Sequence, residues 1–244
     1  MTIKPFKEFI SENINVVDDA LIFNDVEGIE TAFGKGSKLT PFKKTVPGTD
    51  MTSFSLYQAK GANDILKALK SANFNDPEVR QFINRSGLYG ARIIRKFIDS
   101  PDIIVSPKSS SDLTKELALN IQSRTNYDFF IDSFQKTVDL DKIDIHRDDP
   151  RITDDIISSM EKTLKRGRKK GFISVKQFAP QHRKFVKDLF EVLDENLYNK
   201  VIDKNVVIID DVMTTGTTAK QIYDKLIAHG ATEVTTLTMF KATS

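Results

Sequence analysis

The sequence of 244 residues predicts an α/β fold: an open parallel sheet with flanking helices and a small N-terminal lobe. Two observations predict it. Strand-like segments at 102–105 and 206–209 are each followed by a polar loop and then by a segment with helical periodicity. The 206–209 segment contains only valine and isoleucine, which is typical of a strand buried on both faces of a sheet. Strands that alternate with helices form parallel sheets with right-handed crossovers.

The expected elements divide between a lobe at 1–85 and a core at 86–244. In the lobe we expect a strand at 53–58, a helix at 63–70 and a helical region that begins at Asp76-Pro77. The spacing of apolar residues predicts an amphipathic helix at 87–98. The further core elements are strands at 102–105, 127–134, 206–209 and 233–240, helices at 112–123, 186–197 and 217–229, and a short strand within 171–178.

The composition favours a protein of a reducing compartment. The net charge of +2 is too mild to indicate a nucleic-acid partner. Cysteine is absent, which excludes disulfides and thiolate metal sites. The N-terminus lacks the apolar region of a signal peptide, and no apolar run approaches the length that spans a membrane. We therefore expect a cytoplasmic protein with no nucleic-acid or membrane partner.

The segment 206–218 carries the clearest chemical signal. Two adjacent carboxylates, Asp210 and Asp211, follow the apolar strand and suit ribose hydroxyls and a divalent cation. A loop at a helix N-terminus comes next, where hydroxyls and backbone N–H groups suit a phosphate. Its residues are Met213, Thr214, Thr215, Gly216, Thr217 and Thr218. Helix capping alone would explain the threonines but not the acid pair. The segment therefore offers partners for both ends of a ribose 5-phosphate.

This segment resembles the 5-phosphoribosyl 1-pyrophosphate (PRPP) motif of the type I phosphoribosyltransferases. That motif is an apolar strand, two acidic residues, two apolar residues and then Thr-Thr-Gly-x-Thr, and every element is present at 206–218. The resemblance covers roughly 100–240. It implies Mg²⁺-dependent transfer of the phosphoribosyl group from PRPP to a nucleobase or other nitrogen acceptor in nucleotide salvage, with release of pyrophosphate. It also implies that Asp210 and Asp211 hold the ribose hydroxyls, directly or through Mg²⁺.

A second loop, 106–111, follows the first core strand. Because ligands of open parallel sheets lie beyond the carboxyl ends of the strands, we expect this loop and the 210–218 segment to line one pocket. The resemblance implies that the loop binds pyrophosphate, and Lys108 adds a positive charge suited to that role. The candidate residues are Ser106, Pro107, Lys108, Ser109 and Ser110. Taken alone, a serine-rich loop is usually only a connection.

The stretch 137–183 is polar and highly charged. It follows the second core strand, where the resembled family carries a long flexible loop that closes over the site and supplies basic residues to the leaving group. Lys136, Lys165 and Arg166 are the candidates here. The stretch is longer than a lid needs, so an inserted helical hairpin is an alternative. The charges could equally solvate a surface excursion.

The sequence does not decide the acceptor. Relatives that act on 6-oxopurines usually carry an aspartate where this chain has Thr214. Relatives that act on orotate carry a threonine there, but other orotate signals are absent. Lys241 matches in place a lysine that contacts the purine exocyclic oxygen in some relatives, although an exposed lysine is the ordinary expectation so near the C-terminus. The two clues point in opposite directions.

A weaker resemblance is to the ComF-like branch of the family. It rests on the order of Ser55-Leu-Tyr57, the expected helix around 65–70 and the helix before Asp102. That branch typically has an N-terminal cysteine-rich zinc site, which a chain without cysteine cannot form.

The alternative function is a non-catalytic PRPP or nucleotide sensor of the same fold, because a fold does not fix an activity. A catalytic protein needs the lid and its basic residues. A DNA-binding sensor would need a helix-turn-helix or a concentrated basic face, and the sequence shows neither. Homodimers are common in the resembled family, but the sequence does not decide the oligomeric state.

Overall fold

The structure is a computed structural model that describes residues 14–17, 20–23, 29–31, 41–60, 71–109 and 111–243. Its helices are α3 (Pro77–Phe97), α4 (Leu113–Gln122), α5 (Asp154–Lys169), α6 (Asn196–Lys200) and α7 (Thr217–Ala228), with 3₁₀ turns η1 (Leu140–Lys142), η2 (Val175–Gln177) and η3 (Pro180–Phe185). Its strands are β1 (Ile14–Val17), β2 (Ala20–Phe23), β3 (Ile29–Thr31), β4 (Phe42–Thr45), β5 (Thr52–Lys60), β6 (Ile103–Pro107), β7 (Asp128–Lys136), β8 (Asp144–Ile145), β9 (Val186–Lys187), β10 (Phe190–Val192), β11 (Asn205–Met213) and β12 (Glu233–Thr243). Among the described helices, none is both long and apolar enough to cross a membrane.

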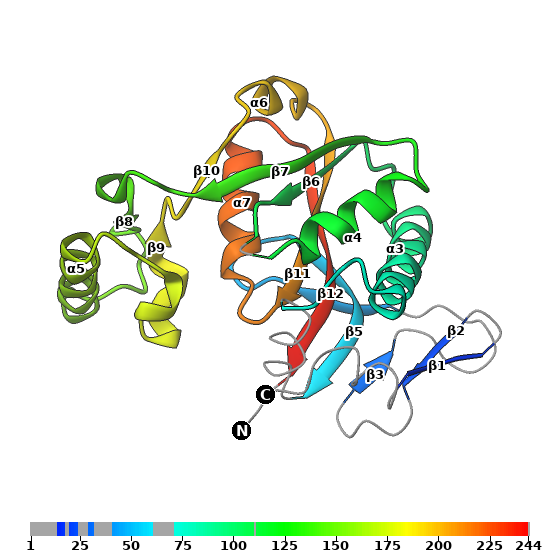
Figure 1. The fold of residues 1–244 in the computed structure, drawn as a ribbon. Coiled ribbons are helices and arrows are strands. Elements are labelled where there is room, and N and C mark those ends of the chain that lie inside the picture. Colours follow the sequence, from blue (N-terminus) through cyan, green and yellow to red (C-terminus); the bar gives the residue numbers. More distant parts are fainter. Residues whose placement is uncertain are drawn as a thin grey trace, which may run out of the picture.

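One sheet of eight strands forms the centre of the molecule (Figure 1). The strands follow the order β10-β7-β6-β11-β12-β5-β3, and β4 also pairs with β5. Strands β7, β6, β11, β12 and β5 run parallel to one another. The edge strands β10, β3 and β4 pair antiparallel. The predicted parallel sheet is confirmed, and short antiparallel strands extend it at both edges.

Helices cover both faces of the sheet. Side chains alternate along a strand, so neighbours in β11 face opposite layers. Val207 and Ile209 belong to a buried cluster with residues of α3 and α4, whereas Val206 and Ile208 belong to a second cluster with residues of α7. All four side chains are at most 1% exposed. The prediction of a strand buried on both faces is therefore confirmed.

The strand predicted at 53–58 is confirmed as β5, and it lies in the main sheet. It pairs in parallel with β12, so Phe54 lies opposite Leu237. The part of the chain that we assigned to an N-terminal lobe therefore contributes a strand to the central sheet. The division at residues 85 and 86 stays a prediction. The helix predicted at 63–70 lies outside the described residues.

The two helical segments predicted from Asp76 and at 87–98 form one continuous helix, α3. Asp76 caps it, because its Oδ1 accepts a hydrogen bond from the backbone N–H of Glu78 at 3.2 Å. Gly87 lies inside the helix, where α4 comes very close. A Cβ at this position would lie 2.5 Å from Cβ of Asn120. Glycine is therefore needed here for the close packing of two helices, and it does not interrupt the helix.

Gly87→Ala should lower the free energy of unfolding by up to about 2 kcal/mol. Alanine favours an exposed helix by about 1 kcal/mol over glycine. At this site the added methyl group would overlap the backbone and Cβ of Asn120, and overpacking costs about 1–3 kcal/mol. Urea unfolding of the two proteins measures the difference. A variant that is more stable than wild type by about 1 kcal/mol, the gain expected for alanine where no neighbour is close, would contradict the close contact between α3 and α4.

The prediction of a helix at 186–197 is wrong. Its apolar residues have helical spacing, but the chain forms β9, β10 and the short helix α6 instead. Tertiary contacts decide the outcome. Strand β10 pairs with β7, and Gln221 of α7 accepts a hydrogen bond from the backbone N–H of Leu189 at 2.8 Å. Asp188 has a φ of +57°, which breaks any helix between these strands.

The segment 137–189 forms a small unit beside the sheet. It contains one α-helix, α5, the three 3₁₀ turns η1 to η3 and the two-stranded pair β8–β9 (Figure 1). The helical hairpin that we considered as an alternative is therefore wrong. The short strand predicted within 171–178 is also wrong, because that stretch forms the 3₁₀ turn η2. We call this unit, from residue 137 to 189, the inserted unit.

Candidate active site

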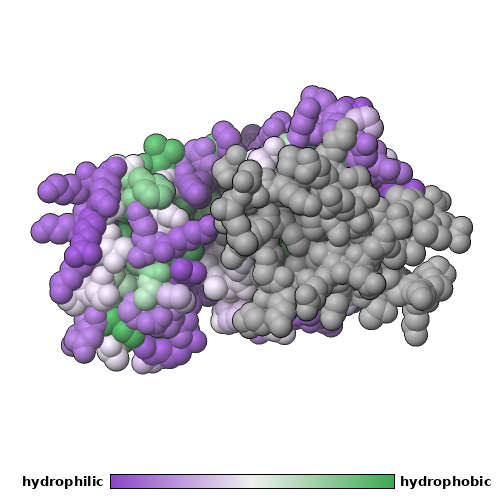
Figure 2. Space-filling model, turned by 60° about the horizontal axis from the view of Figure 1, so that its bottom comes forward, coloured by the Kyte–Doolittle hydropathy of each residue, from purple (hydrophilic) through white to green (hydrophobic). Residues whose placement is uncertain are grey.

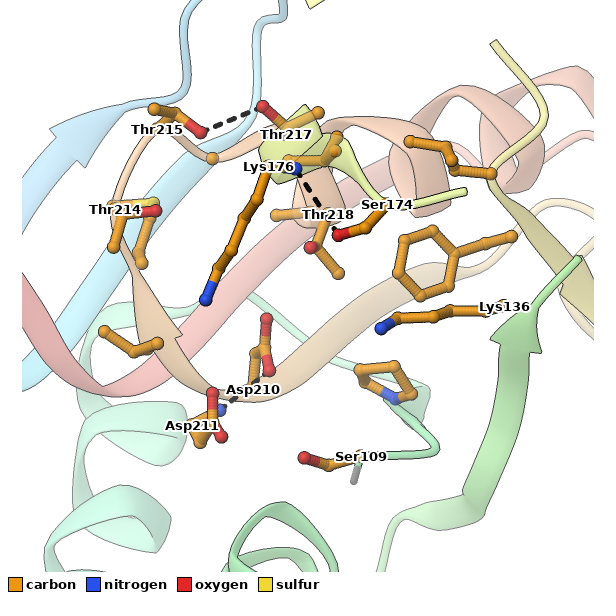
Figure 3. Close-up of a pocket in the computed structure, with 18 of the residues that line it drawn as sticks. Ser109, Lys136, Ser174, Lys176, Asp210, Asp211, Thr214, Thr215, Thr217 and Thr218 are labelled. Carbon is orange, nitrogen blue, oxygen red and sulfur yellow. Dashed lines mark hydrogen bonds between the residues drawn. The ribbon is translucent and has the colours of Figure 1, made fainter. Parts of the chain in front are cut away.

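A cavity of about 390 Å³ lies at the carboxyl ends of β6, β7 and β11. Its walls come from the end of β11 and the loop before α7, from the loop after β6, from the end of β7 and from the inserted unit (Figure 3). The two loops that the sequence assigns to one pocket thus line one cavity. The position is the one where open parallel sheets bind their ligands.

The acid pair lies in the wall of this cavity. Strand β11 continues through both acids to Met213, beyond the apolar run from which the strand was predicted. Asp211 is 4% exposed and Asp210 is half-buried. Oδ1 of Asp210 accepts a hydrogen bond from the backbone N–H of Asp211 at 2.8 Å (Figure 3). This contact fixes the orientation of the Asp210 carboxylate at the wall of the cavity.

The loop after β11 has the geometry of an anion site. Every predicted residue from Met213 to Thr218 lines the cavity. Gly216 has a φ of +77° and precedes the first turn of α7, and the hydroxyls of Thr215 and Thr217 lie 2.9 Å apart. A Cβ at Gly216 would lie 2.8 Å from Cγ1 of Val46, so the β4–β5 hairpin supports the loop from behind. Backbone N–H groups at the start of a helix and the helix dipole both favour a phosphate at this place.

The second predicted loop reaches the cavity only in part. Pro107, Lys108 and Ser109 line it. Ser106 does not, because it belongs to β6, is 1% exposed, and its Oγ accepts a hydrogen bond from the backbone N–H of Asp132 at 3.1 Å. Ser106 therefore holds β6 to β7 and has no exposed group to offer a ligand. Ser110 lies outside the described residues.

The basic residues predicted for the lid have different positions. Lys136, at the end of β7, lines the cavity and points into it (Figure 3). Lys165 and Arg166 are exposed on α5 and do not line it. At the left of Figure 2, hydrophilic residues form the outermost edge of the inserted unit, with smaller hydrophobic areas beside them. The exposed positions of Lys165 and Arg166 on α5 fit the alternative that these charges solvate a surface.

Lys241, the predicted contact to a purine base, does not line the cavity either. It lies in β12 opposite Met213 and is half-buried. Strand β12 runs on to Thr243, so Lys241 lies within the strand and not at its end. The structure thus gives no support to a role in base recognition.

Several lining residues were not predicted. They are Ile173, Ser174, Val175, Lys176, Leu189, Phe190, Val212, Ala219 and Thr238. The most consequential is Lys176, a cation in the turn η2. The sequence does carry a signal for this turn. A serine followed three residues later by glutamine is the capping-box pattern, and Ser174 and Gln177 form such a box in the structure. No sequence signal placed that turn over the cavity.

The donor groups of the cavity fit Mg²⁺. Carboxylate oxygens are the ligands that Mg²⁺ prefers, and it usually takes one or two carboxylates together with substrate phosphates. The described residues contain no cluster of three or more acidic, histidine or cysteine side chains able to hold a metal. Asp210 and Asp211 are therefore the residues that would hold an ion shared with a phosphorylated substrate.

Residues 130–244 match the family model of the phosphoribosyl transferase domain. This match, over a little under half of the chain, is to a phosphoribosyl transferase domain. The matched residues include the acid pair, the whole threonine loop and the inserted unit, but the match begins after the loop that follows β6. The resemblance inferred from 206–218 is confirmed. The match does not distinguish a ComF-like branch from the others.

Solved structures of phosphoribosyltransferases resemble the chain at low identity. A hypoxanthine-guanine phosphoribosyltransferase from Bacillus anthracis str. 'Ames Ancestor' is 14% identical, with a TM-score of 0.36 and 65% of each chain covered. Glutamine PRPP amidotransferase from B. subtilis is 18% identical, with a TM-score of 0.36 and coverage of 65% of this chain and 26% of that chain. A purine phosphoribosyltransferase from Pyrococcus horikoshii Ot3 is 12% identical, with a TM-score of 0.35 and coverage of 65% of this chain and 81% of that chain.

These values are too low to carry an argument about activity or substrate. The chain spans 65% of the length of the B. anthracis enzyme and 26% of the amidotransferase. No curated protein sequence matches the chain.

Proposed function

We propose that this phosphoribosyl transferase domain is a Mg²⁺-dependent enzyme of cytoplasmic nucleotide salvage. It would transfer the 5-phosphoribosyl group from PRPP to a nucleobase or another nitrogen acceptor and release pyrophosphate. One observation carries the proposal. The acid pair and the threonine loop of the matched domain line the same cavity as Lys108, Ser109 and Lys136.

The lining residues suggest how PRPP would lie. The 5-phosphate belongs at the threonine loop, where backbone N–H groups and the α7 dipole favour an anion. The ribose hydroxyls belong at Asp210 and Asp211, which accept hydrogen bonds. The pyrophosphate belongs beside Lys108 and Lys136, because ammonium groups attract the charge of that leaving group. Both ends of PRPP then have partners within one cavity.

The reaction would be a displacement at C1 of PRPP. The C1–O bond breaks and its electron pair leaves with pyrophosphate, while a lone pair of the acceptor nitrogen forms the new C1–N bond and the acceptor proton passes to solvent. When bound, Mg²⁺ would neutralise charge on the pyrophosphate. The protein contributes mainly position and electrostatics. Lys108 and Lys136 would stabilise the departing charge, and the carboxylates would hold the ribose by its hydroxyls.

The acceptor stays open. Thr214 lines the cavity where an aspartate would indicate a 6-oxopurine enzyme, and Lys241 is not in the cavity wall. Four apolar residues also line the cavity: Ile173, Val175, Leu189 and Phe190. Apolar side chains would suit the face of a planar ring, which is common to purine and pyrimidine acceptors.

Pyrophosphate release tests the proposal. The protein is incubated with Mg²⁺, PRPP and a panel of purine, pyrimidine and other nitrogen acceptors, and pyrophosphate is followed over time. We expect release that requires both PRPP and one acceptor of the panel. Binding of PRPP without release on any acceptor would favour the alternative of a non-catalytic sensor. A protein that neither binds PRPP nor releases pyrophosphate would contradict the assignment of the cavity.

A further inference from the structure

The turn that carries Lys176 is held in place by contacts of its own. Ile173 is 5% exposed and packs against Gly167 of α5, where a Cβ would lie 2.5 Å from Cγ1 of Ile173. In the capping box, the backbone N–H of Ser174 donates to Oε1 of Gln177 at 3.1 Å, and the backbone N–H of Lys176 donates to Oγ of Ser174 at 3.4 Å. The inserted unit therefore presents Lys176 from a built turn.

Lys176 brings a positive charge to the cavity. It is exposed and lines the cavity. Within the described part of the chain, it makes no ion pair with a carboxylate. An ammonium group with no counter-ion, at the wall of a cavity that suits phosphates, is a binding group for an anion.

Two of the three lysines that line the cavity, Lys176 and Lys136, approach it from different sides. In Figure 3, the Lys176 side chain extends from η2 into the cavity, and its end is drawn on the side of Thr214 and Asp210. Lys136 enters from the end of β7, on the side of Ser109. Lys176 thus enters the cavity on the side of Thr214, the first threonine of the loop, and Lys136 enters it on the side of Ser109.

We propose that Lys176 binds the 5-phosphate of the donor, opposite the threonine loop, while Lys136 serves the pyrophosphate end. This inference rests on the proposed function for the identity of the donor. The 5-phosphate is then held from two sides, by the N–H groups at the start of α7 and by the ammonium group of the inserted unit. The inserted unit would accordingly recognise the donor substrate through Lys176, in addition to lending the apolar residues Ile173 and Val175 to the cavity wall.

Three ligands distinguish binding at one end of the donor from binding at the other. Ribose 5-phosphate has only the 5-phosphate, pyrophosphate has only the leaving group, and PRPP has both. Each is titrated with Mg²⁺ into the full chain by calorimetry. Lys176→Gln should weaken the binding of ribose 5-phosphate and of PRPP about tenfold to a hundredfold, which is the loss expected for one charged hydrogen bond. The affinity for pyrophosphate should not change. Lys136→Gln should weaken the binding of PRPP and of pyrophosphate, and the affinity for ribose 5-phosphate should not change.

Lys162→Gln is the matched control, because it removes the same charge from an exposed position on α5 that does not line the cavity. It should change none of the three affinities. An unchanged affinity for ribose 5-phosphate in Lys176→Gln would overturn the inference, and so would an equal loss for pyrophosphate.

The outcome is distinguishable from a failure of the proposed function. If wild-type protein binds ribose 5-phosphate through Lys176 but releases no pyrophosphate with any acceptor, the role of Lys176 stands and the transferase activity does not. If pyrophosphate is released but Lys176→Gln binds ribose 5-phosphate like wild type, the activity stands and the inference about Lys176 fails.

Discussion

Replacing Asp210 and Asp211 together with asparagine is expected to abolish detectable PRPP binding while the fold stays intact. Both carboxylates line the cavity, and each hydrogen bond to a charged group contributes about 1.5–3 kcal/mol. Loss of both would weaken binding by at least about a hundredfold. Asparagine has the same shape as aspartate, and its Oδ1 can still accept the hydrogen bond from the backbone N–H of residue 211. Calorimetric titration with Mg²⁺ and PRPP measures the loss.

Asp154→Asn with Asp155→Asn is the control for this double variant. These are also two adjacent aspartates, but they lie exposed in the first turn of α5 and do not line the cavity. PRPP affinity should match that of wild type, although stability will fall slightly because acids favour a helix N-terminus. A thermal melt of both double variants checks the fold. If PRPP affinity survived the change at 210 and 211, the cavity would not be the PRPP site.

Gly216→Ala should give the second largest effect, because it distorts the phosphate loop. A φ of +77° costs a non-glycine residue about 1–2 kcal/mol. The added Cβ would also lie 2.8 Å from Cγ1 of Val46, so the loop or the β4–β5 hairpin must shift. We expect a loss of about 2–4 kcal/mol in the free energy of unfolding and at least a tenfold weaker binding of PRPP. Urea unfolding and calorimetry measure the two quantities.

Gly171→Ala separates the two causes. Gly171 has a φ of +67°, and a Cβ there would meet nothing within 4 Å. This variant should therefore show the backbone cost alone and bind PRPP like wild type. Equal stability losses in the two variants, with PRPP affinity unchanged in both, would show that Val46 does not support the loop.

The central strand and the phosphate loop could be predicted because local sequence decides them. The run of valine and isoleucine at 206–209 allows few structures other than a buried strand, and Gly216 among threonines fits a left-handed turn before a helix. The acid pair follows that apolar run directly, so its place near the carboxyl end of the strand needs no long-range information. The same holds for Lys108 and Ser109 after β6.

The inserted unit could not be predicted in the same way, because long-range contacts decide it. The apolar residues of 186–197 have helical spacing, yet β10 forms because it pairs with β7 and because Gln221 of α7 holds Leu189. The positions of basic residues depend on that packing. Lys165 and Arg166 looked equivalent to other basic candidates by sequence, but α5 turns them to solvent while η2 turns Lys176 to the cavity.

The pairing of β5 with β12 is likewise a long-range feature. A strand could be predicted at 53–58, but its place in the sheet could not, because it pairs with residues 183 positions later in the chain. Because β4 pairs with β5, the turn after β4 is also placed by this long-range pairing, and that turn brings Val46 next to Gly216.

The structure of the protein with Mg²⁺ and PRPP, determined by crystallography, is the most direct test of the PRPP site. The 5-phosphate should lie within hydrogen-bonding distance of the backbone N–H groups between Thr215 and Thr218, with the ribose beside Asp210 and Asp211 and the pyrophosphate beside Lys108. PRPP bound elsewhere on the chain, with this cavity empty at saturating ligand, would contradict the assignment.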